Sequence, residues 1–96
     1  MNFKTSSAFQ KQLREQSSKS IREAYRNKVK IFLKNPYDPS LDNHELEHEW
    51  KGYRSFDVTD NYRVIFKKAD RETYLFFAFG NHDQLYRKWR RSDDID

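Results

Sequence analysis

The sequence predicts an α+β fold in which two N-terminal helices pack on a small antiparallel β-sheet. Hydrophobic residues recur every three or four positions in the first third of the chain, but every second position after about residue 50. Helical and strand segments are therefore separated along the chain, as in α+β proteins. Eight Phe, six Tyr and two Trp offer large apolar surfaces for one core. Residues 1–96 are thus expected to form a single domain.

Two helices are expected, over residues 7–16 and 20–34. Ser7 and Ser20 each precede a Gln or Glu by three positions, which is the capping-box pattern of a helix start. Asn35 ends the second helix, because a residue before proline is disfavoured in the helical region. The spacing of the apolar residues in this second segment places them on one helix face. These residues are Ile21, Ala24, Tyr25, Val29, Phe32 and Leu33.

The remainder of the chain is expected to form a loop and then strands. Residues 35–49 contain two prolines and several turn-forming residues, which is typical of a surface loop. Strands are predicted at residues 53–58, 63–67 and 73–79, where β-branched and aromatic residues alternate with polar ones or form short runs. The last of these is apolar almost throughout, as expected of a strand covered on both faces. Phe3 is assigned to a short first strand.

The charge distribution favours a polyanionic partner. The net charge is +4, yet residues 36–49 contain five acidic and no basic residues. The segments on either side are basic, and such surfaces bind nucleic acids or acidic proteins. The absence of cysteine excludes a disulfide framework and suits a reducing compartment. The chain also lacks a signal-peptide pattern and any apolar run of the ~18 residues that cross a bilayer, so a cytoplasmic protein without membrane contact is expected.

Three histidines are candidates for chemistry. His44 and His48 have the i,i+4 spacing of a zinc-binding pair, but nearby prolines and the lack of cysteine argue against helical metal ligands. For each histidine the simpler interpretation is an exposed surface residue. His82 stands out because it follows the last strand, where a turn places side chains in clefts. With only two glycines the chain also lacks a phosphate-binding loop, so neither a metal nor a nucleotide cofactor is expected.

Basic and aromatic residues of the predicted strands form a second candidate group. Arg54 lies in the first strand of a predicted hairpin, and Arg63 opens the next. A guanidinium binds phosphate with two parallel hydrogen bonds and stays charged, so it can stabilise the phosphorane formed during RNA cleavage. The rings of Tyr62, Tyr86 and Trp89 are candidates for stacking on bases. The alternatives are solvated edge charges for the arginines and ordinary core packing for the rings.

An ordered set of motifs adds a family resemblance. These motifs are NPYDPSL and HEL in residues 35–46, WKGYRSF and NYRVIF in residues 50–66, and FGNHD and LY in residues 79–86. Together they resemble the RelE/ParE superfamily of bacterial type II toxins, most closely its RelE/StbE and YafQ-like mRNA interferase branches. The resemblance spans about residues 3–87. It implies a RelE-like fold and metal-free cleavage of ribosome-bound mRNA, in which a base deprotonates the 2′-OH that attacks the adjacent phosphate.

The resemblance also implies roles for single residues. His44 stands where relatives carry the proposed base, and Arg63 matches an arginine that contacts the scissile phosphate in YoeB-like members. His82 matches a histidine proposed as general acid or phosphate ligand. The expected catalytic residues are therefore His44, Arg63 and His82. The expected RNA-binding residues are Lys51, Arg54, Tyr62, Tyr86 and Arg87.

Two positions depart from the YafQ-like pattern. Asp57 replaces a second histidine, and Asn61 replaces an aspartate. A carboxyl group does not donate a proton at neutral pH unless its pKa is raised, so Arg63 is expected to compensate electrostatically.

The resemblance implies three kinds of partner: a cognate antitoxin that forms a hetero-oligomer with the toxin, the mRNA, and the ribosome. Two alternatives stay open at this point. One is a ParE-like inhibitor of DNA gyrase, a class that generally lacks the His and Arg cluster. The other is an inactive module that only binds an antitoxin.

Overall fold

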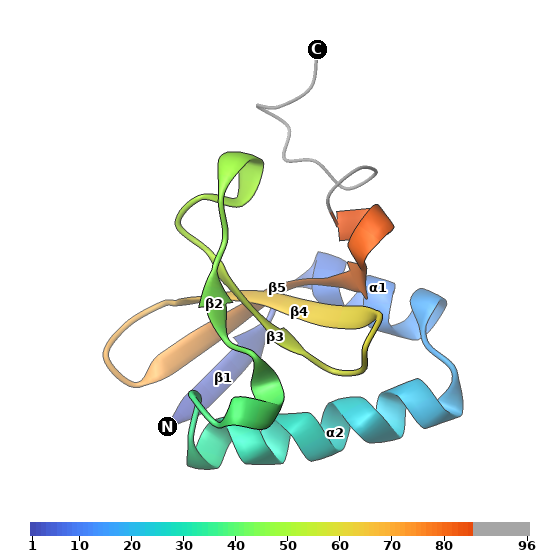
Figure 1. Cartoon of the computed structure of the whole chain (residues 1–96), viewed down its shortest axis with the longest axis horizontal. Coiled ribbons are helices and arrows are strands. Elements are labelled where there is room, and N and C mark those ends of the chain that lie inside the picture. Colours follow the sequence, from blue (N-terminus) through green and yellow to red (C-terminus); the bar gives the residue numbers. More distant parts are fainter. Residues whose placement is uncertain (86–96) are drawn as a thin grey trace.

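The computed structural model describes residues 1–85, which form two helices and a five-stranded sheet (Figure 1). The helices are α1 (Ser7–Gln16) and α2 (Lys19–Lys34). The strands are β1 (Asn2–Thr5), β2 (His44–Glu45), β3 (Arg54–Asp57), β4 (Tyr62–Lys68) and β5 (Thr73–Asn81). Two short 3-10 helices, η1 (Pro39–Leu41) and η2 (His48–Trp50), lie on either side of β2. The predicted α+β class and both predicted helices are confirmed.

The sheet is mixed, whereas the sequence predicts an antiparallel one. Its strand order is β1-β5-β4-β3-β2, and the pairs from β2 to β5 are antiparallel. The pair of β1 with β5 is parallel, with Phe3 opposite Tyr74. Short turns join β3 to β4 and β4 to β5, but β1 and β5 are separated by both helices and the other three strands, so no hairpin sets their relative direction.

The helix starts also differ from the predicted ones. The capping residues are Ser6 and Ser18. The Ser6 hydroxyl accepts a hydrogen bond from the backbone N–H of Phe9 at 3.0 Å, and the Ser18 hydroxyl accepts one from the N–H of Ile21 at 3.3 Å. Ser7 and Ser20 were therefore wrong as caps. Serines stand on both sides of each start, so the pattern alone leaves the choice open. Ser6 also donates a hydrogen bond to the Phe77 carbonyl at 2.9 Å, which ties the start of α1 to β5.

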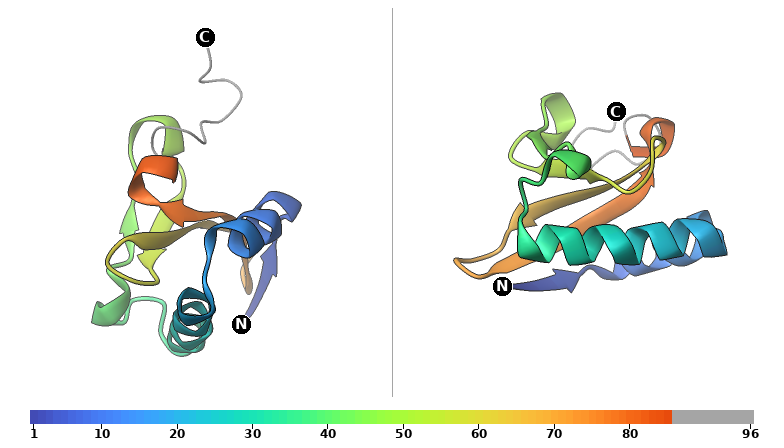
Figure 2. Two further views of the ribbon diagram at one scale, coloured as in Figure 1. Left: turned by 90° about the vertical axis from the view of Figure 1, so that its right-hand side faces the viewer. Right: turned by 60° about the horizontal axis from the view of Figure 1, so that its bottom comes forward.

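Apolar residues cover both faces of the sheet. On one face, α1 and α2 pack Phe9, Val29 and Phe32 against an aromatic cluster that includes Phe56 and Phe76. On the other, residues 46–53 and one turn of helix at residues 82–85 lie over the sheet (Figure 2). The buried residues of this second cluster are Leu46, Trp50, Ile65, Ala78 and Leu85. β5 is therefore covered on both faces, as its apolar sequence predicts.

The segment predicted as a loop, residues 35–49, contains the edge strand β2. His44 pairs with Ser55 and Glu45 with Arg54 in this short antiparallel pair. Two residues are too few to show an alternating pattern, so only the structure reveals that His44 lies on the sheet. Within residues 1–85 no helix combines the length and apolar character needed to span a membrane.

Candidate active site

A pocket of about 400 Å³ lies on the sheet face opposite the helices. The catalytic residues expected from the sequence, His44, Arg63 and His82, all line it. They come from β2, from β4 and from the position directly after β5. The other lining residues are Glu45, Leu46, Glu47, His48 and Glu49. Folding thus brings together three polar side chains that are far apart in the sequence.

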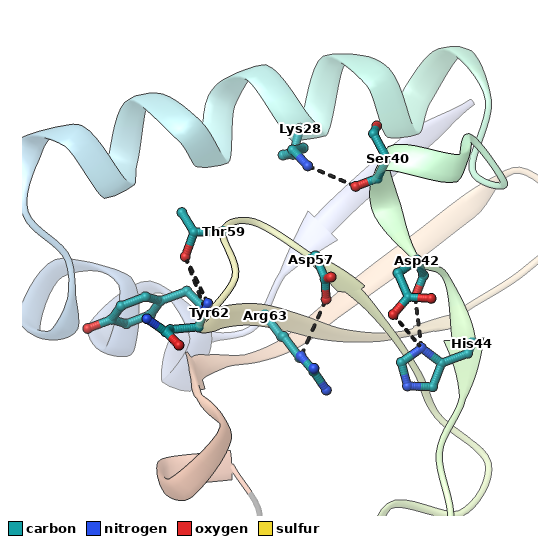
Figure 3. A network of polar contacts seen from close by, with 9 residues as sticks. Lys28, Ser40, Asp42, His44, Asp57, Thr59, Tyr62 and Arg63 are labelled. Atoms are coloured by element: carbon teal, nitrogen blue, oxygen red, sulfur yellow. Dashed lines mark hydrogen bonds and ion pairs between the residues drawn. The ribbon is translucent and has the colours of Figure 1, made fainter.

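The ring of His44 is oriented by a neighbouring backbone carbonyl. Its Nδ1 lies 2.8 Å from the carbonyl oxygen of Asp42 and 3.9 Å from the Asp42 carboxylate (Figure 3). A carbonyl only accepts hydrogen bonds, so Nδ1 carries the proton and Nε2 of the neutral ring keeps its lone pair. Asp42 itself has a left-handed backbone with φ of 48°, which L residues seldom adopt. This local conformation supports a histidine that can accept a proton at Nε2.

Arg63 is held by a carboxylate on the adjacent strand. Asp57 and Arg63 are paired residues of β3 and β4, and their Oδ1 and Nε atoms lie 3.3 Å apart. Neither atom has a hydrogen-bond partner within residues 1–85, so the contact is an ion pair without hydrogen-bond alignment. The terminal nitrogens of Arg63 extend away from Asp57 (Figure 3). The end of the guanidinium can therefore contact an anion while Asp57 holds Nε.

The pKa of Asp57 is raised above its ordinary value. Desolvation by burial is the main cause, and the positive charge of Arg63 lowers the pKa without cancelling that effect. The nearby Asp42 adds a smaller upward contribution. Burial thus disfavours the ionised carboxylate at the position where the resemblance leads one to expect a histidine.

His82 is placed by a helix cap that follows β5. The backbone N–H of Asn81 donates to Gln84 Oε1, and the N–H of Gln84 donates to Asn81 Oδ1, both at 2.9 Å. This reciprocal pair is a capping box, and it begins the turn of helix at residues 82–85. The spacing of Asn81 and Gln84 in the sequence could have predicted it. A second anchor is less visible in the sequence, because Trp50 Nε1 donates to the Leu85 carbonyl at 2.8 Å from a distant segment.

The predicted RNA-binding residues are not gathered in this pocket. Arg54 bonds Asn43 Oδ1 at 2.7 Å, lies 3.5 Å from Glu45 and lines a different pocket. Tyr62 stacks on Phe79 within the helix-side core and also borders a pocket that shares His82. Lys51 is exposed just after η2 and lines none of these pockets. Two other predicted contacts, Tyr86 and Arg87, lie outside the described residues, as does Trp89.

The pocket includes polar side chains that sequence reasoning left aside. His48, for which the simpler interpretation from the sequence was an exposed surface residue, lines it together with three glutamates, Glu45, Glu47 and Glu49. The acidic run in the sequence was the available signal, but it was interpreted as part of a loop. Within residues 1–85, no three His, Asp or Glu side chains are grouped so that they could hold a metal ion.

Comparison with known families identifies the chain. A family model described as a bacterial toxin of a type II toxin-antitoxin system, YafQ, matches residues 1–87. This chain belongs to the YafQ family of type II toxins. The superfamily inferred from the motifs is therefore confirmed for this YafQ-family toxin. No protein with a curated description matches the sequence significantly.

Solved structures share the fold of this YafQ-family toxin. YafQ from E. coli strain BL21(DE3) has a TM-score of 0.70 at 22% identity, covering 88% of this chain and 96% of that one. A YoeB/ParE toxin from Agrobacterium tumefaciens has 0.68 at 13% identity, covering 85% and 99%. The RelB-RelE antitoxin-toxin complex from Methanococcus jannaschii gives 0.67 at 15% identity, covering 88% and 96%. At these identities the likeness shows the fold alone.

Proposed function

We propose that this YafQ-family toxin is an mRNA interferase, an endoribonuclease that cuts ribosome-bound mRNA in the cytoplasm by metal-free transesterification. The observation that carries the proposal is the convergence of His44, Arg63 and His82 on one pocket. Two imidazoles and a guanidinium supply the base, the acid and the cation that this chemistry needs. An inhibitor of DNA gyrase or an inactive antitoxin-binding module would not require these three groups in one place.

Each of the three groups has a role in the proposed mechanism. Nε2 of His44 accepts the proton of the 2′-OH, because Nδ1 is occupied by the Asp42 carbonyl. The 2′-oxygen then attacks the adjacent phosphorus while the terminal nitrogens of Arg63 bind the phosphate oxygens. As the bond from phosphorus to the 5′-oxygen breaks, His82 gives a proton to that oxygen. The products are a 2′,3′-cyclic phosphate and a 5′-OH end.

Asp57 acts in this mechanism through Arg63. It contacts Nε and leaves the terminal nitrogens of the guanidinium for the phosphate. A carboxylate in place of a histidine would repel the phosphate if it faced the substrate unaccompanied. Paired with Arg63, it orients the cation instead. Asp57 is therefore a positioning residue and not the general acid.

A cognate antitoxin is the proposed protein partner, in a toxin-antitoxin hetero-oligomer. Membership of a type II toxin family supports this, as does the shared fold with RelE in the RelB-RelE antitoxin-toxin complex. The net charge of +4 suits an acidic antitoxin segment that competes with RNA for the same basic surface. Binding of the antitoxin would then block cleavage by covering the pocket or the surface around it.

The test is to induce the toxin and map the 5′ ends of mRNA fragments. Cleavage by the wild type should produce 5′-OH ends, and His44→Ala and His82→Ala should each lose most of it. His48→Ala is the matched control, because His48 lines the same pocket but has no role in the mechanism. Fragments with 5′-phosphate ends would contradict transesterification. Intact mRNA together with altered DNA supercoiling would point to gyrase inhibition.

A further inference from the structure

Helix α1 supplies hydrogen-bond partners to β5 at the end that leads to His82. Strand β1 pairs with residues 73–76 of β5, so within the described part of the chain the outer edge of residues 77–81 has no neighbouring strand. Helix α1 lies along this edge (Figure 1), and Gln12 Oε1 accepts a hydrogen bond from the Phe79 N–H at 2.9 Å. A side chain of the helix thus takes the place of a strand at the end of β5.

The side chain of Gln84 joins α1 to the turn that carries His82. Its Oε1 accepts a hydrogen bond from the Asn81 N–H at 2.9 Å, and its Nε2 donates to Gln16 Oε1. These bonds fix both side-chain amides, because the Asn81 N–H needs the oxygen of Gln84, and the nitrogen that remains needs an oxygen on Gln16. Gln12 and Gln16 are four positions apart on α1 and therefore lie on one helix face. That face holds both the last strand and the turn that follows it.

The position of His82 depends on how the turn at residues 82–85 is attached. His82 is exposed, directly follows β5 and lines the catalytic pocket. Trp50 anchors the end of the turn through the Leu85 carbonyl, on the sheet face that carries the pocket. Gln16 attaches the same turn to α1, which packs on the opposite face. The turn is therefore held from both layers that cover the sheet.

Accurate placement matters for the role that His82 has in the proposed mechanism. A general acid must lie within hydrogen-bond reach of the oxygen that it protonates. A misplacement of about 1 Å can cost about 10²-fold in rate, even when its cause lies away from the reacting atoms. The attachment of the turn to α1 is thus a means of setting the rate from outside the pocket.

We infer that Gln16 is a positioning residue for this reaction, which acts through Gln84 on the turn that presents His82. This inference rests on the proposed ribonuclease function and adds a residue from α1 that does not line the catalytic pocket. The feature that Gln16 contributes is an acceptor oxygen at the end of an unbranched side chain. Glutamate should therefore replace it, and methionine should not.

The test measures the maximal rate of single-turnover cleavage of ribosome-bound mRNA. Gln16→Met keeps the length of the side chain and a good helix former but removes the oxygen, so the rate should fall by about 10–10²-fold. Gln16→Glu retains an acceptor and should restore most of the rate. The matched control is Gln10→Met on the same helix, because Gln10 Nε2 donates to Thr5 Oγ1 and takes no part in the link to His82. This control should keep the wild-type rate.

A double variant separates positioning from a general effect on folding. If Gln16 acts only through His82, adding Gln16→Met to His82→Ala should slow cleavage hardly further. Equal losses in the wild type and in His82→Ala, a wild-type rate for Gln16→Met, or no rescue by Gln16→Glu would each overturn the inference and leave the ribonuclease function intact. A full rate for His82→Ala would overturn the role of His82 and this inference with it. A wild-type toxin that does not cut RNA would overturn the proposed function itself.

Discussion

Trp50 should hold the two walls of the catalytic pocket together, and Trp50→Phe tests this role. The indole is 2% exposed and donates through Nε1 to the Leu85 carbonyl at 2.8 Å. This bond joins the segment after His44 to the turn of helix that begins at His82. Phenylalanine keeps an aromatic ring in the position but removes the donor and part of the packing volume.

The cost follows from the burial of the bond. Leaving a buried carbonyl such as that of Leu85 without a partner costs about 1–3 kcal/mol. The smaller ring adds a packing loss against Tyr53 and Phe77, its two ring neighbours. In a domain of this size each kcal/mol lowers Tm by about 4–8 °C. A loss of about 2 kcal/mol therefore predicts a Tm lower by roughly 8–16 °C.

Circular dichroism recorded during thermal unfolding measures the change in Tm. Cleavage is measured well below the Tm of the variant. The rate should fall as well, because the loosened turn places His82 less accurately. Tyr37→Phe is a control on an exposed ring, and its stability should change by less than about 0.5 kcal/mol. An unchanged Tm for Trp50→Phe would refute the anchoring role. An unchanged Tm with lost activity would indicate direct contact of the indole with substrate.

Three further predictions concern the pocket. His44→Ala and His82→Ala should each slow single-turnover cleavage by about 10²–10⁴-fold, whereas His48→Ala should stay near the wild-type rate; equal losses for all three would indicate a folding defect. Arg63→Lys keeps the charge but loses the planar fork, so kcat should fall by about 10²–10³-fold while ribosome binding persists; a wild-type rate would show that a point charge suffices. Because burial raises the pKa of Asp57 in the folded state, its protonated form stabilises the fold at low pH and this contribution is lost as pH rises through the raised pKa. The free energy of unfolding of Asp57→Asn in urea, relative to that of the wild type, should therefore increase as pH rises from about 4 to 7. A decrease of this difference over the same range would show that the ion pair with Arg63 outweighs burial.

Much of the fold could be predicted from the sequence because its signals are local. The apolar spacing in residues 20–34 defines one helix face over a few turns, and Asn35 before proline ends it. The change of period after η2 likewise predicts β3 and β4 within a few residues of their bounds. The motifs around His44 and His82 identified the superfamily, and they also selected three residues that line one pocket.

The tertiary structure decided what depends on contacts between distant residues. The direction of β1 follows from its pairing with β5, about seventy positions along the chain, and no local pattern carries that choice. The two-residue strand β2 exists only because β3 lies beside it, and this pairing sets His44 on the sheet. The sequence by itself thus determined the elements and the chemical groups, since periodicity and turn residues act over short ranges. The register of β3 against β4 decided that Asp57 meets Arg63. The packing of residues 46–53 and 82–85 over one sheet face decided that Trp50 meets Leu85.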